Sequence, residues 1–171
     1  MRKPFVAGLV FVTVTLATTA VFACGDKLML LAGSARFRQV FPGSRPASIL
    51  AYSRQNSSVH GLVNDLEHQS TLKHAGYKVF AIEDRTRLDE ALKTGKFDLL
   101  LVDAADAEGL EPQARSAPSR PLVLPVVYKS TKAEAKSVER KFHCVLKAPS
   151  SPDRFLAAID EAMGVKLKMA Q

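Results

Sequence analysis

The chain has 171 residues, of which 47% are hydrophobic and 24% are charged. These proportions are ordinary for a soluble globular protein, and the length allows one well-buried core, so nothing calls for a second domain. The formal net charge is +7, and it is +5 without Arg2 and Lys3 at the start of the chain. This modest excess favours anionic partners without specifying one, and we expect no nucleic-acid partner.

Residues 1–23 are predicted to be a signal peptide. The segment begins with two basic residues and continues as an uncharged apolar run that ends at Val21-Phe22-Ala23. The run approaches the roughly 20 apolar residues that span a bilayer, so an uncleaved membrane anchor is the alternative. The small-residue pattern at its end, with no positive cluster after it, favours cleavage and therefore export to the periplasm.

Cys24 follows this cleavage site, and the four residues ending at Cys24 resemble a bacterial lipobox, in which the cysteine is lipidated. Phe22 fits that pattern poorly, so a lipoprotein anchored through Cys24 and a soluble periplasmic protein both stay open. Membrane contact is expected only through such an anchor. Cys144 is the other cysteine, and a disulfide is possible in an oxidising compartment. A small buried hydrophobe is the favoured interpretation of Cys144.

Residues 24–46 show no regular pattern and are interpreted as an N-terminal tether. From 47 to 164 short apolar runs alternate with amphipathic segments. The predicted strands cover 48–52, 77–82, 97–102, 122–128 and 142–146. The predicted helices cover 59–74, 86–94, 131–141 and a last segment from 152 to just before Gly164, with one helical turn within 104–110. Residues 165–171 are left as a tail. The alternation predicts an α/β domain with a parallel sheet between two helical layers.

Three segments, 72–79, 95–103 and 146–159, resemble the receiver domains of response regulators in their order and spacing. The resemblance implies a three-layer, doubly wound sheet of five parallel strands in the flavodoxin-like order 2-1-3-4-5. It also implies that a binding site lies at the carboxyl ends of the strands.

Carried over by this resemblance, Asp103 matches the family's phosphoacceptor and Lys147 matches the lysine that contacts the phosphoryl group. The acidic pair that holds magnesium in the family is replaced by a stretch containing Arg54, and Tyr128 stands where the family has a small hydroxyl residue. Magnesium needs oxygen ligands, so we expect no metal site. Asp103 and Lys147 are interpreted as a vestigial site that forms a structural ion pair.

No other pattern predicts catalysis. The histidines lack the spacing that puts two ligands on one helical face, and they are expected at the surface. They are His60, His68, His74 and His143. We therefore expect no cofactor and no catalytic residues.

One charge pattern remains, in which Lys132, Lys136 and Arg140 recur every fourth residue and form a basic stripe on a predicted helix. A solvated helix face is the simpler explanation, and contact with an anionic partner is the functional one. Taken together, the sequence favours a non-catalytic, receiver-like interaction module of the cell envelope that binds an envelope protein or an anionic surface. The alternatives are a phosphoacceptor receiver acting through Asp103 and a small-molecule binder at the carboxyl ends of the strands.

Overall fold

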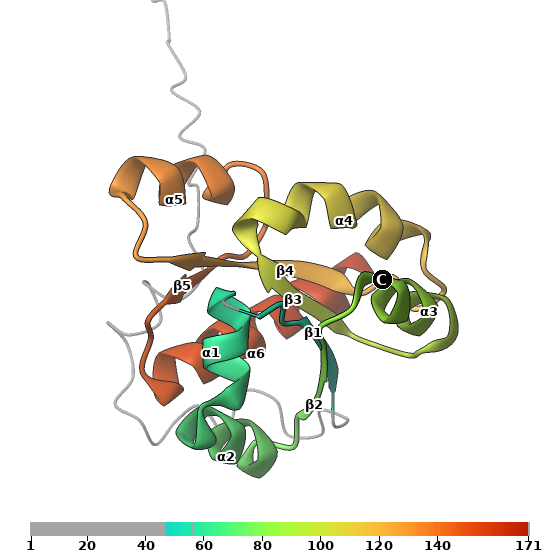
Figure 1. Cartoon of the computed structure of the whole chain (residues 1–171), viewed down its shortest axis with the longest axis horizontal. Coiled ribbons are helices and arrows are strands. Elements are labelled where there is room, and N and C mark those ends of the chain that lie inside the picture. The colour runs from blue at the N-terminus through green and yellow to red at the C-terminus, as the bar shows by residue number, and fades with distance from the viewer. Residues whose placement is uncertain (1–46, 56, 171) are drawn as a thin grey trace, which may run out of the picture.

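The computed structural model describes residues 47–55 and 57–170. In this part of the chain, strands and helices alternate as the sequence predicts (Figure 1). The strands are β1 (Ser48–Tyr52), β2 (Lys78–Ile82), β3 (Leu99–Asp103), β4 (Leu122–Tyr128) and β5 (Leu146–Ala148). The helices are α1 (Ser58–Asn64), α2 (Leu66–His74), α3 (Arg85–Thr94), α4 (Ala104–Ser116), α5 (Lys132–Glu139) and α6 (Pro152–Met169).

The sheet is parallel throughout, and its strand order is β2-β1-β3-β4-β5. This confirms the predicted fold class and the predicted 2-1-3-4-5 order. Parallel neighbours require a crossover connection, which the helices supply. The carboxyl ends of all the strands therefore lie on the same side of the sheet, where β3 ends at Asp103.

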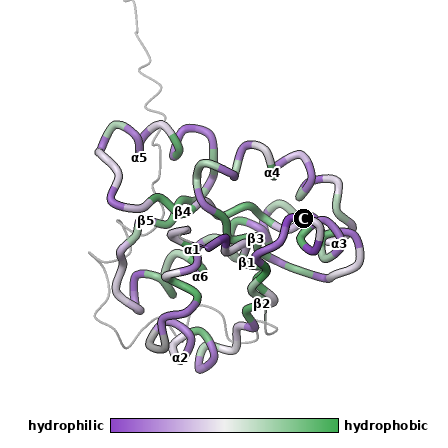
Figure 2. The backbone as a smooth tube through the Cα atoms, viewed as in Figure 1, coloured by the Kyte–Doolittle hydropathy of each residue, from purple (hydrophilic) through white to green (hydrophobic). Residues whose placement is uncertain are grey.

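Both faces of the sheet are buried around β3. Side chains of a strand alternate between the two faces, so Leu99 and Leu101 pack in the core that includes Phe155 of α6. Leu100 belongs to the opposite core, which includes Leu88 of α3. The hydropathy colouring shows hydrophobic strands in the centre of the fold (Figure 2). The continuous apolar run of β3 is thus explained by burial on both sides.

One edge of the sheet is β2, whose residues are mostly exposed or half-buried. Phe80 is 48% exposed and packs edge-on against Phe97, with ring centroids 5.6 Å apart. The other edge is β5, which has three residues. The two edges therefore differ in both length and exposure.

The single helix predicted over 59–74 is wrong, because the structure has two helices that are separated at Asp65. Asp65 has extended backbone angles (φ −72°, ψ 120°), and its Oδ1 accepts a hydrogen bond from the His68 N–H at 3.3 Å. A carboxylate that caps the first amides of a following helix favours such a break. Periodicity alone does not reveal it, since the apolar positions continue across the junction.

Helix α4 is longer than the single turn that was predicted within 104–110. It reaches Ser116 although Pro112 lies inside it. Ala107, Leu110 and Ala114 form a buried stripe at helical spacing against the sheet. This packing outweighs the intrinsic preference of proline against a helix interior.

Two boundaries near the C-terminus also differ from the prediction. Strand β5 begins at Leu146 rather than at Phe142, because Phe142 is buried without pairing in the sheet, whose register with β4 begins at Leu146. Helix α6 does not end before Gly164 but continues to Met169, through most of the predicted tail. Lys166 anchors this last part by donating hydrogen bonds to two loop carbonyls. No helix of the described residues is long and apolar enough to cross a membrane.

A partly buried polar contact joins the residue before β2 to α6. The Tyr77 hydroxyl donates a hydrogen bond to Asp160, and both side chains are partly buried. Burial raises the pKa of Asp160, although the hydrogen bond from Tyr77 acts in the opposite direction. Burial also raises the pKa of Tyr77 above its ordinary value.

We predict that Asp160→Asn is at least as stable as wild type at pH 7. The raised pKa means that the folded state favours the protonated carboxyl, so the stabilising contribution of Asp160 is present below its unfolded pKa and is lost as pH rises through its folded pKa. An asparagine keeps the acceptor for Tyr77 and carries no charge. Urea unfolding at pH 4 and pH 7 measures this, and the advantage of the variant should grow with pH.

The exposed Asp153, in the first turn of the same helix, provides the matched control. Asp153→Asn removes a carboxylate that interacts favourably with the helix N-terminus, so it should not gain stability with pH. Equal pH dependence of the two variants would contradict the interpretation of Asp160.

Candidate functional site at the carboxyl ends of the strands

Asp103 lies where the sequence places it, at the last position of β3 and immediately before α4. Its side chain makes no capping hydrogen bond to α4. Instead, Oδ1 accepts a hydrogen bond from the backbone N–H of Ser58, at the start of α1, at 3.2 Å. The carboxylate therefore ties the end of the central strand to the loop that follows β1.

Arg54 occupies that loop and forms an ion pair with Asp106, in the first turn of α4. The Arg54 Nη2 and Asp106 Oδ2 atoms are 2.5 Å apart. The guanidinium also lies over the ring of Tyr52, 5.9 Å from its centroid. Because the Arg54 side chain is half exposed, the ion pair contributes at most about 1 kcal/mol to stability. Its main effect is to place a protein cation at this edge of the sheet.

An ion pair between Lys147 and Asp103 was predicted, but the partner of Lys147 in the structure is Glu139. The Nζ atom of Lys147 lies 2.9 Å from Oε1 of Glu139, at the end of α5. Tyr128 is 50% exposed and has the ammonium of Lys129 above its ring, 5.1 Å from the centroid. The end of β4 therefore carries a large aromatic ring, and Lys147 pairs with a residue of α5.

The side chains at this edge do not fit the magnesium ion that the receiver resemblance implies. Magnesium is held by oxygen ligands, usually including one or two carboxylates. Here Arg54 supplies a cation, and the carboxylate of Asp106 is already neutralised by it. Within residues 47–55 and 57–170, no group of three or more His, Cys, Asp or Glu side chains could hold a metal ion.

Sequence reasoning missed two groups at or near this edge. Asp106 carries no motif, and only the structure reveals that it is the partner of Arg54. His68 was expected at the surface but is 6% exposed, with its Nε2 atom 3.1 Å from the carbonyl oxygen of Ser150 and its ring against Phe155. A histidine in an amphipathic helix gives no signal that distinguishes these two environments.

The basic stripe of Lys132, Lys136 and Arg140 lies on α5 and at its C-cap, and all three residues are exposed. The opposite side of the helix is turned toward the core, where Ala135 is buried. A capping box formed by Thr131 and Glu134 begins the helix. The stripe therefore faces solvent, as both interpretations of it require.

Cys144 is buried, as predicted, but it is disulfide-bonded rather than a free thiol. The chain has one other cysteine, Cys24, which lies outside the described residues. The favoured interpretation of Cys144 as a small hydrophobe is therefore corrected. Sequence reasoning could not decide this because a disulfide depends on the distance and direction of two Cβ atoms. The predicted signal peptide and tether also lie outside the described residues.

The fold is similar to several solved receiver domains. A response regulator from Thermotoga maritima matches with a TM-score of 0.53 at 15% identity, over 70% of this chain and 98% of its own. The signal receiver domain of an HD domain-containing protein from Pseudomonas fluorescens gives a TM-score of 0.57 at 15% identity, over 77% and 97%. HP1043, an orphan response regulator of H. pylori, gives 0.54 at 17% identity, over 70% and 99%.

No protein-family model matches the chain, and no curated protein matches it. Because the identities to the solved structures are low, these similarities define the fold alone. The chain therefore has a receiver-domain fold, as the sequence resemblance implied.

We predict that wild type shows no saturable magnesium binding, whereas Arg54→Asp gains weak binding. The substitution removes the cation, frees Asp106 and adds a carboxylate near Asp103. Chemical-shift titration with magnesium chloride, followed at Asp103 and Asp106, measures the difference.

Arg85→Asp is the matched control, because Arg85 is exposed to a similar degree and also pairs with an aspartate, Asp89. It should not create magnesium binding at the end of β3. Saturable binding by wild type would contradict the prediction. So would a stable acyl phosphate formed from acetyl phosphate that the Asp103→Asn variant loses.

Proposed function

We propose that the chain is a non-catalytic interaction module of the cell envelope, built on a receiver scaffold. The observation that carries the proposal is the Arg54–Asp106 ion pair, which stands where receiver chemistry requires a metal-binding acidic pair. Phosphoryl transfer depends on positioning and on neutralising charge, so the loss of the metal removes most of the catalysis. The scaffold without that chemistry is still suited to binding a partner.

Two alternatives follow from the same edge of the sheet. A phosphoacceptor role is favoured by the position of Asp103 at the end of β3, but Lys147 pairs with Glu139. A small molecule bound at the carboxyl ends of the strands stays a prediction. The fold is shared with response regulators and signal receiver domains, which favours a signalling or interaction role over enzymatic turnover.

The proposed contact surface is the basic stripe on α5. The helix also carries two acidic residues, but Glu134 is engaged in the capping box and Glu139 pairs with Lys147. Lys132, Lys136 and Arg140 have no ion-pair partner among the described residues. Their charge is therefore not offset locally, which favours an anionic envelope protein or surface as the partner.

Export is proposed from the sequence, on the signal peptide of residues 1–23 and its junction with Cys24. A periplasmic location would separate the domain from cytoplasmic phosphodonors, which agrees with a non-catalytic role. Cys144 is disulfide-bonded and Cys24 is the other cysteine of the chain, so this disulfide uses the thiol that lipidation would need. A lipid on Cys24 would therefore hold the domain at a membrane surface only in a chain without the disulfide.

We predict that reversing the stripe, with Lys132, Lys136 and Arg140 changed to Glu, abolishes binding to vesicles containing anionic lipid or to an acidic envelope protein. The side chains face water, so the thermal midpoint should stay close to that of wild type. Wild-type binding should weaken as salt shortens the Debye length below about 8 Å. Vesicle sedimentation and pull-down at low and high salt measure this.

Exposed basic residues outside α5 allow a control with the same change in net charge. They are Lys73, Arg87 and Lys93. Reversing these three should leave most of the binding intact. Equal loss in the two triple variants would mean that net charge, and not the stripe, determines binding.

We predict that the mature chain begins at or next to Cys24. The motive is the basic start followed by an apolar run that ends in small residues. Mass spectrometry of the N-terminal peptide after expression in a bacterial host distinguishes the outcomes. A diacylglyceryl adduct on Cys24 identifies a lipoprotein and excludes a disulfide between Cys24 and Cys144, because both use the Cys24 thiol. An unmodified new N-terminus identifies a soluble periplasmic protein, and an intact Met1 contradicts export by cleavage.

A further inference from the structure

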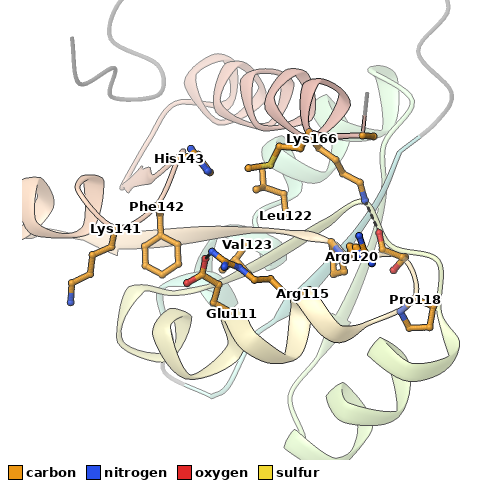
Figure 3. Close-up of a pocket in the computed structure, with 14 residues that line it drawn as sticks. Glu111, Arg115, Pro118, Arg120, Leu122, Val123, Lys141, Phe142, His143 and Lys166 are labelled. Carbon is orange, nitrogen blue, oxygen red and sulfur yellow. Dashed lines mark hydrogen bonds and ion pairs between the residues drawn. The ribbon is translucent and has the colours of Figure 1, made fainter. Parts of the chain in front are cut away.

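A cavity of about 540 Å³ lies at the amino-terminal end of β4 (Figure 3). It is enclosed by the end of α4, the loop 118–121, the start of β4, the segment 141–143 and the end of α6. Asp103 lies toward the opposite end of the strands, at the carboxyl end of β3. Because Asp103 is in register with Val126, four residues along β4 from Leu122, the two places are roughly 13 Å apart along the strand direction. The cavity is thus separate from the site that the receiver fold implies.

The floor of the cavity is apolar. Leu122 and Val123 begin β4, and Phe142 precedes β5 on the neighbouring chain segment. Val123 and Phe142 are buried, and Leu122 is half-buried. A volume of this size with a hydrophobic floor is within the range of small-molecule pockets in proteins.

The wall of the cavity is rich in cations. One carboxylate, that of Glu111, is accompanied by five basic side chains. They are Arg115, Arg120, Lys141, His143 and Lys166. Arg115 is neutralised by Glu111 at 2.5 Å, and Lys141 by Glu108 at 2.5 Å.

Lys166 is the most buried of the charged groups, with its side chain 18% exposed. Its ammonium donates to the carbonyl oxygens of Phe97 and Ser119 at 3.3 and 3.2 Å and lies 3.6 Å from Oδ1 of Asp98. Burial lowers the pKa of Lys166, and Asp98 only partly opposes this effect. An anion in the cavity would stabilise the charged form of this lysine.

Arg120 is the basic residue whose charge is not compensated. Its guanidinium has no hydrogen-bond or ion-pair partner among the described residues, and the residue is exposed at the cavity. Its backbone is also left-handed, with φ 43°. That conformation is unfavourable for a residue with a Cβ atom and is usually taken by glycine. The loop thus accepts backbone strain at the position that presents an arginine to the cavity.

We propose that this cavity binds a small organic anion, a carboxylate with an apolar body, whose carboxylate is held by Arg120 with Lys166 nearby and whose body lies on Leu122, Val123 and Phe142. The guanidinium offers two parallel donors that match a carboxylate. The apolar floor favours a hydrocarbon or aromatic body over a free inorganic ion. This site goes beyond the proposed interaction role and does not depend on it.

The test uses the full chain and three probes: decanoate, acetate and decyltrimethylammonium. Acetate has the carboxylate without the body, and decyltrimethylammonium has the same chain with the opposite charge. We expect saturable binding of decanoate alone, with backbone chemical shifts changing at Leu122, Phe142 and Lys166. Calorimetry gives the dissociation constants.

Arg120→Gly should weaken decanoate binding by about tenfold or more while leaving the thermal midpoint equal or higher, because glycine relieves the left-handed strain. Lys129→Gly is the matched control, since Lys129 is also exposed and left-handed, with φ 43°, at the other end of β4. It removes the same charge and the same strain away from the cavity, and its binding should match wild type.

The proposal is overturned if decanoate does not bind, if acetate or decyltrimethylammonium binds as tightly, if the two glycine variants behave alike, or if the shift changes lie outside the cavity.

Discussion

Burial of β3 on both of its faces is the constraint on which the rest of the fold depends. A strand that is apolar at every position from Leu99 to Val102 must have a helical layer on each side. The neighbouring strands β1 and β4 then lie beside it in parallel, since helices connect β3 to the strands before and after it in the chain. The first polar residue of β3, Asp103, is consequently found where the strand leaves the core.

The two ends of this sheet differ in how their charges are satisfied. At the carboxyl ends, Arg54 and Asp106 neutralise one another, and Asp103 accepts a backbone N–H. At the amino-terminal end of β4, Arg120 presents a charge that no described residue balances. At the carboxyl ends of the strands, where the receiver resemblance places the site, the charged side chains are therefore paired with groups of this chain. At the amino-terminal end of β4, an unbalanced charge lies beside an apolar cavity.

The sequence was sufficient to predict the features that follow from local pattern. The strand β4, the capping box at Thr131 and the proline at the start of α6 could all be read from short segments, because periodicity and end signals are local. The strand order came from the resemblance to receiver domains and was confirmed by the pairing of β1 with both β2 and β3.

Features that depend on distant residues were not predictable. The length of α4 is determined by packing against the sheet, which overcomes Pro112. The partners of Arg54 and Lys147 were missed because ion pairs depend on which side chains the fold brings together, and Asp106 and Glu139 have no distinguishing pattern. At the carboxyl-end site, Asp103 was placed correctly, but its interaction with Ser58 was not. No sequence pattern predicts the cavity near Arg120, because the residues that line it come from elements far apart in the chain.

The two edge strands of the sheet, β2 and β5, have different consequences for the behaviour of the protein at high concentration. An edge strand offers unpaired N–H and C=O groups to another chain, and length and hydrophobic exposure increase that hazard. The three-residue β5 is short, whereas β2 has five residues and exposes Phe80. Lys78, an exposed charge at the start of β2, is the kind of residue that discourages such pairing. Aggregation of partly unfolded molecules is therefore expected to nucleate at β2 and not at β5.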